Sequence, residues 1–102
     1  MTKNIKTLKE ELREIKHYYS QMDELEKVGK VIGTPQMMIV VELYNKKILK
    51  APIRLYSLYV SLYLKNKPQN VVADEWGVSL SQIALLSKKL NEFLIEEFNE
   101  KD

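Results

Sequence analysis

Cysteine is absent from the 102 residues of this chain, and glycine and proline occur only three times each. Without thiols the chain forms no disulfides and offers no thiolate ligands, which fits a reducing compartment. A composition of 45% hydrophobic and 29% charged residues, with so little glycine and proline, favours a folded helical protein over disorder. At this length we expect one domain, or one small domain with an appended helix.

Long hydrophobic runs are missing as well. No apolar stretch approaches the ~20 residues that a membrane-spanning helix needs. The N-terminal segment M-T-K-N-I-K-T-L-K-E-E-L is charged throughout and lacks the apolar core of a signal peptide. We therefore expect a cytoplasmic protein with no membrane partner.

Residues arranged for catalysis or metal binding are also few. His17 is the only histidine, and there is no cysteine to act with it as a metal ligand. The chain has neither a phosphate-binding glycine loop nor a G-x-S-x-G nucleophile motif. We predict no enzymatic activity, no metal, no cofactor and no small-molecule substrate.

Acidic residues are missing from one long stretch of the chain. Residues 43–73 hold six basic side chains and no acid, whereas residues 1–42 are balanced at seven of each and residues 74–102 hold seven acids and three bases. Such segregation indicates a surface patch for a polyanion. The alternative is that the lysines are the solvated edges of amphipathic helices.

The spacing of the apolar residues predicts an all-α protein. We expect an N-terminal amphipathic, coiled-coil-like helix within residues 1–30, followed by a compact helical domain over residues 34–102. Within that domain, Thr34-Pro35 and Ala51-Pro52 mark two helix starts. The helix over 52–65 is apolar except for one narrow polar stripe, so we expect it to be the central helix, covered on three sides.

The first helix carries an apolar seam at spacings of 3, 4, 3, 4 and 3, which is a heptad pattern. The seam residues are Ile5, Leu8, Leu12, Ile15, Tyr19 and Met22. We predict that this seam pairs with its twin in a homodimer. The alternative is that the helix folds back against the other helices of the same chain.

A helix-turn-helix pattern lies at about residues 69–90. Ala73 is a small residue suited to a close helix crossing, and Gly77, four positions on, is suited to the turn. Ser79 with Gln82 three residues later predicts a capping box at the start of the second helix. The apolar face of that helix comprises Ile83, Leu86 and Leu90. The alternative is an ordinary helical hairpin with a glycine turn.

The order of elements over residues 52–94 resembles the fourth region of sigma factors and the small phage late-gene transcription regulators of the RinA and ArpU type. The resemblance rests on A-P-I-R-L-Y, the linker N-K-P, V-V-A-D-E-W-G-V-S and S-Q-I-A-L-L-S-K-K-L. It implies a phage-type transcription regulator that binds double-stranded DNA and contacts RNA polymerase. The second helix of the motif departs from that pattern because it is poor in arginine and rich in apolar residues.

The outward positions of the motif are the expected DNA contacts. These are Ser79, Ser81, Gln82, Leu85, Lys88 and Lys89, with Lys65 and Lys67 placed before the motif for phosphates. Gln82 is suited to adenine and Leu85 to a thymine methyl, and no arginine is placed for guanine. We therefore predict a binding site rich in A·T pairs.

Two other functions are consistent with the same residues. The exposed Leu85, the apolar final helix and the acidic C-terminal part would also suit a protein-interaction module that docks on RNA polymerase or another regulator, or a phage-type inhibitor. A purely structural coiled-coil protein is the third possibility. Binding to DNA through about six phosphates weakens steeply with salt, whereas an apolar protein interface does not.

Overall fold

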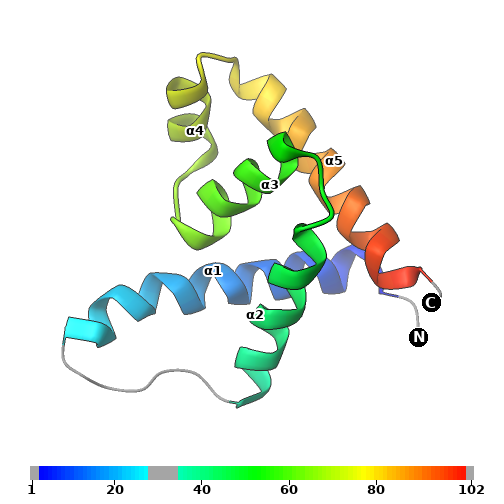
Figure 1. The fold of residues 1–102 in the computed structure, drawn as a ribbon. Helices are drawn as coiled ribbons and strands as arrows, with labels where there is room; N and C mark the ends of the chain where they lie inside the picture. Colours follow the sequence, from blue (N-terminus) through cyan, green and yellow to red (C-terminus); the bar gives the residue numbers. More distant parts are fainter. Residues whose placement is uncertain (1–2, 28–34, 101–102) are drawn as a thin grey trace.

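The computed structural model describes residues 3–27 and 35–100, and within these ranges all regular structure is helical. The elements are α1 (Ile5–Lys27), α2 (Pro35–Ile48), α3 (Ile53–Tyr59), the π-helical segment η1 (Val60–Leu64), α4 (Gln69–Trp76) and α5 (Leu80–Asn99) (Figure 1). The all-α class is therefore confirmed. The predicted helix start at Thr34 lies outside the described residues.

Every helix contributes to one hydrophobic core. Its buried residues are Leu8, Leu12, Ile15, Val41, Tyr44, Ile48, Leu55, Leu58, Tyr59, Leu62, Val72, Ala73, Ile83, Leu90 and Leu94. The two buried tyrosine hydroxyls have partners: Tyr44 donates to Glu11 Oε1 at 2.8 Å, and Tyr59 donates to Asn45 Oδ1 at 2.8 Å. Such bonds offset the cost of removing each hydroxyl from water.

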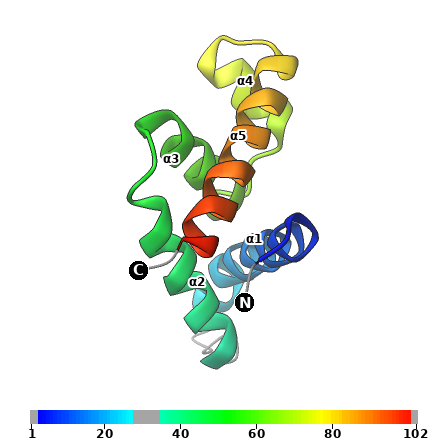
Figure 2. The same ribbon diagram turned by 90° about the vertical axis from the view of Figure 1, so that its right-hand side faces the viewer.

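The long helix α5 organises the molecule. It packs against α3 and α4 as well as α1 and α2. Figure 2 shows α5 with α3 on one side and α1 on the other. The end of α5 is tied to the start of α1, because the Lys3 backbone N–H donates to Asn99 Oδ1 at 2.6 Å and Asn99 Nδ2 donates to the Lys3 carbonyl at 3.1 Å.

The α1 seam faces the core of its own chain. Leu8, Leu12 and Ile15 are at most 2% exposed and belong to the same buried cluster as the other helices. The prediction of a coiled-coil arm that pairs through these three residues is therefore wrong for this fold, and the fold-back alternative describes them. Of the remaining seam residues, Ile5 is exposed and Tyr19 is half-buried, while the Met22 side chain lies outside the described part.

The expectation for the helix over 52–65 is correct in one respect and wrong in another. One face of α3 and η1 is buried against the other helices, through Leu55, Leu58, Tyr59 and Leu62. The helix is not covered on three sides, however, because Ile53 is 77% exposed and other apolar residues are only half-buried. Periodicity identifies apolar faces, but the number of neighbouring helices decides how many of them are covered.

Candidate nucleic-acid interface

The turn between α4 and α5 depends on a left-handed glycine. Gly77 has φ 67° and ψ 34°, a conformation that costs residues with a Cβ about 1–2 kcal/mol. The Val78 N–H donates to the Ala73 carbonyl at 3.0 Å, which closes the end of α4. The buried Ala73 and the positive φ of Gly77 agree with what the sequence pattern requires at these two positions.

The start of α5 is held by the predicted capping box. The Gln82 backbone N–H donates to Ser79 Oγ at 3.1 Å, and the Ser79 backbone N–H donates to Gln82 Oε1 at 3.0 Å. The box has a consequence for recognition. An adenine pair uses both the oxygen and the nitrogen of a glutamine amide, and the Gln82 oxygen is already engaged. While the box is intact, the amide nitrogen is free for a base and the oxygen offers only its second lone pair.

The expected contact residues on α5 face solvent. Ser81, Leu85 and Lys88 follow one another at spacings of four and three, so they share one face of the helix, and all three are exposed. Lys89 is exposed beside them, while Ile83 and Leu90 are buried on the opposite face. The helix therefore presents a short row of small polar, aliphatic and cationic side chains to a partner.

The two lysines before the motif differ in their availability. Lys65 is exposed, and no ion pair involves it within residues 3–27 and 35–100. Lys67 pairs with Glu75, with its Nζ 2.9 Å from both carboxylate oxygens. A half-exposed pair of this kind is worth at most about 1 kcal/mol. A phosphate contact by Lys67 therefore requires the exchange of Glu75 for the phosphate.

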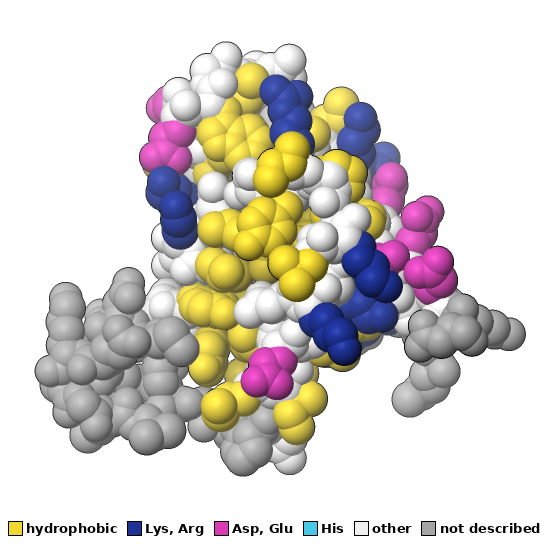
Figure 3. All heavy atoms as spheres, in the orientation of Figure 1, with side chains coloured by type: hydrophobic (Ala, Val, Ile, Leu, Met, Phe, Trp, Pro, Cys, Tyr) yellow, Lys and Arg dark blue, Asp and Glu magenta, His cyan; other side chains and the backbone are white. Residues whose placement is uncertain are grey.

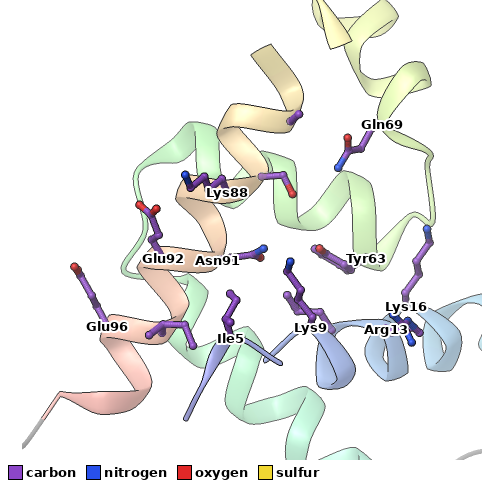
Figure 4. A pocket seen from close by; sticks show the side chains of 14 residues that line it. Ile5, Lys9, Arg13, Lys16, Tyr63, Gln69, Lys88, Asn91, Glu92 and Glu96 are labelled. Carbon is purple, nitrogen blue, oxygen red and sulfur yellow. The ribbon is translucent and has the colours of Figure 1, made fainter. Parts of the chain in front are cut away.

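A basic groove between α1 and α5 was not foreseen from the sequence. It has a volume of about 970 Å³. Lys9, Arg13 and Lys16 line it from α1, and Lys88 lines it from α5 on the side of Glu92, as Figure 4 shows. None of these four cations forms an ion pair with another described residue. The α1 cations recur at spacings of four and three, which places them on one helix face, but the intervening glutamates made this face look like the outside of a coiled coil.

Polar as well as apolar side chains line the rest of the groove. Burial raises the pKa of the Tyr63 phenol, and its hydrogen bond with Ser87 lowers that pKa in part, so the hydroxyl is protonated at neutral pH. The Oδ1 atom of Asn91 is buried without a hydrogen-bond partner in the described part of the chain. Glu92 and Glu96 line the end away from Lys16, so the groove is cationic at one end and acidic at the other.

The described residues contain no cluster of three or more His, Cys, Asp or Glu side chains that would hold a metal ion. No helix in the described ranges has the length and apolarity needed to cross a membrane. Comparisons with protein-family models, with curated proteins and with solved structures found no match to this chain.

Proposed function

We propose that this chain is a transcription regulator that binds double-stranded DNA, with α4, the Gly77 turn and α5 acting as a helix-turn-helix. The observation that carries the proposal is the exposed row of Ser81, Leu85, Lys88 and Lys89 on α5, which continues into the basic groove. In such motifs the second helix enters the major groove with its first turns. The exposed residues of α5 lie in those turns.

The cations support the phosphate part of this interaction. Lys88 and Lys89 on α5, Lys9 and Arg13 on α1, and the exposed Lys65 have no ion pair among the described residues. With Lys16 they number about six, enough for affinity to fall roughly a thousandfold between 50 and 200 mM salt. In this proposal α1 supplies phosphate contacts and is not a dimerisation arm.

In this proposal, small polar and apolar side chains of α5 contact the bases. Ser81 hydrogen-bonds several bases, and Leu85, at 55% exposure, packs on a thymine methyl. Gln82 contributes its free amide nitrogen. No arginine lies on this row, so the proposed site is rich in A·T pairs. A base-swap series that gave dominant discrimination for guanine would contradict this choice.

Assembly, RNA polymerase contact and phage origin remain predictions. A homodimer of this fold would have to use residues other than Leu8, Leu12 and Ile15, because these are buried within one chain. Contact with RNA polymerase and a phage origin rest on the resemblance over residues 52–94. The alternative of a protein-interaction module that uses α5 is favoured by one observation, the exposure of Leu85 among otherwise polar neighbours.

The proposal is tested by anisotropy titration of random duplex DNA at 50 and 200 mM salt. We expect wild-type binding to be strongly salt-sensitive. We expect Lys88→Glu/Lys89→Glu on α5 and Lys9→Glu/Arg13→Glu on α1 each to weaken it about tenfold or more, because each double variant replaces two phosphate contacts by repulsion.

A matched control separates the effect of charges that line the groove from the effect of the net charge of the protein. Lys6→Glu/Lys46→Glu makes the same change in net charge at two exposed lysines that do not line the groove. We expect this variant to bind within a factor of about three of wild type. Absence of wild-type binding at low salt would overturn the proposal. Equal losses in all three variants would reduce the interaction to a nonspecific charge effect.

A further inference from the structure

A second surface of the molecule is an unpartnered apolar stripe on α3 and η1. It consists of Ile53, Tyr56, Val60 and Leu64, at spacings of 3, 4 and 4 along α3 and η1, together with Leu49 in the turn between α2 and α3, and is called the α3 face. Leu49 is 70% and Ile53 77% exposed, and the other three are half-buried. Figure 3 shows apolar side chains running in a broad band down the same side of the molecule as α3 in Figure 1.

The α3 face is hollowed along both flanks of the helix. On one flank a hollow of about 310 Å³ lies between α2 and the helix, lined by Ile48, Leu49, Tyr56, Val60, Leu64 and Tyr59 among others. On the other flank a hollow of about 300 Å³ is lined by Ile53, Arg54, Ser57 and Trp76. Large exposed apolar patches are uncommon on soluble proteins that function alone and mark interaction sites. A ridge between two hollows is a shape that receives the side chains of a second helix.

The rim of the α3 face is positively charged. Lys46 and Arg54 are exposed around it, and neither forms an ion pair with another residue in the described ranges. The α3 face lies entirely within residues 43–73, which contain no acidic residue. Lys50, which follows Leu49 in the sequence, is engaged, because its Nζ lies 3.6 Å from Glu97 Oε1.

From this geometry we infer that the α3 face docks an amphipathic α-helix of a partner protein, with an apolar stripe flanked by acidic residues. The spacings of the stripe match the i, i+3, i+4 and i+7 anchors of helix-in-groove recognition. The free cations select acidic flanks on the partner. A second copy of the chain fits poorly, because a two-fold pairing would bring identical cationic rims together.

The partner class also differs from the DNA proposed for α5. Nucleic acids offer charged phosphates and stacked bases, which do not cover a row of aliphatic side chains. The α3 face is distinct from the basic groove, because none of its five residues lines the groove. The inference therefore stands independently of the proposed function, and both partners can bind at once.

The test uses a panel of designed, fluorescein-labelled helical peptides of about 18 residues, or five turns. Each peptide has a leucine and isoleucine seam with glutamate flanks, and the panel varies the register of the seam. An isomeric set carries lysine in place of glutamate. We expect anisotropy titrations with the intact chain to give dissociation constants on the order of 10 µM for glutamate peptides. The lysine set should bind at least about tenfold more weakly.

Variants locate the binding surface. Leu49→Asn/Ile53→Asn should reduce peptide affinity about tenfold or more, and both residues are so exposed that the fold is kept. The matched control is Leu85→Asn, an exposed leucine on α5, which should leave peptide affinity unchanged. Arg54→Glu/Lys46→Glu should reverse the preference toward the lysine peptides.

Three outcomes would overturn the inference. The first is no glutamate peptide binding below about 1 mM. The second is equal binding of glutamate and lysine peptides. The third is a concentration-dependent dimer of the wild-type chain in sedimentation velocity that Leu49→Asn/Ile53→Asn abolishes, which would make a second copy the occupant. Loss of DNA binding in the α5 variants bears only on the proposed function.

Discussion

The basic groove and the α3 face share no lining residue and rest on the same core, yet they offer different chemistry. The groove brings cations from α1 and α5 together with polar, aliphatic and acidic side chains. The α3 face brings aliphatic and aromatic side chains together, with cations only at its rim. The difference arises from the number of apolar faces. The single apolar seam of α1 is buried in the core at Leu8, Leu12 and Ile15. In contrast, α3 and η1 have apolar residues on two faces, and only one of these faces is buried.

The largest expected effect on stability comes from a substitution that tests which side of α1 belongs to the core. Leu12→Lys places a cation at a site that is 2% exposed, so we expect it to cost several kcal/mol and to unfold much of the protein. The measurement is thermal unfolding followed by circular dichroism. Ile5→Lys makes the same change at an exposed seam position and should be tolerated. A folded Leu12→Lys monomer that replaced a wild-type dimer would restore the coiled-coil interpretation.

The next prediction compares the loss of stability caused by substitutions on the two faces of α3. Leu58→Ala removes a fully buried side chain and should lower the free energy of unfolding by about 3 kcal/mol. Ile53→Ala, on the exposed face, should change it by less than about 0.5 kcal/mol. Urea denaturation of both variants and of the wild type measures the difference. Similar losses at the two positions would mean that Ile53 is covered within the chain, and the docking inference would fail with it.

A smaller effect on stability is expected at the α4–α5 turn, and it should leave binding at the α3 face unchanged. A Cβ on Gly77 would have no atom within 4 Å, so strain arises only from its φ of +67°. We expect Gly77→Ala to destabilise the fold by about 1–2 kcal/mol, and Gly77→Asn to cost less because asparagine tolerates this conformation. Binding of the glutamate peptides should not change in either variant at a temperature where both are folded. A Gly77→Ala protein as stable as wild type would show that the turn adopts another conformation without penalty.

The smallest expected effect is a loss of folding stability at alkaline pH, caused by the buried tyrosines of the core. Burial, followed by the charges of Tyr19 and Tyr63, raises the pKa of the Tyr59 phenol above its usual value. Burial and the hydrogen bond to Glu11 raise the pKa of Tyr44 similarly. Because these pKa values are higher in the folded chain, the stabilisation is complete below pH ~10 and is lost as pH rises through the folded values.

At pH 10 each of these phenols should already lower the free energy of unfolding by about 0.4 kcal/mol relative to pH 8, because the unfolded phenol is half ionised. Urea denaturation at pH 8, 10 and 11 measures the decline. Tyr59→Phe should make that decline shallower. A decline of equal slope in this variant would place the alkaline sensitivity elsewhere.

The elements of the α4–α5 unit could be predicted from local rules. The left-handed Gly77 and the capping box between Ser79 and Gln82 depend on backbone geometry within a few residues. The groove could not be predicted in the same way. Lys9 and Lys88 are far apart in the sequence, and nothing in the pattern of either helix indicates that the two will line one groove.

The sequence by itself determined the helical class, the capped start of α5 and which stripe of each helix is apolar, because these follow from periodicity, capping and turn chemistry over short distances. Tertiary structure alone decided which apolar stripes are covered. The α1 seam was equally suited to a twin helix or to its own chain, and packing against η1, α5 and α2 made it core. The second apolar stripe of α3 was left exposed because the chain has no further described helix to place over it. Competition among apolar faces for a limited number of partners is a property of the whole fold.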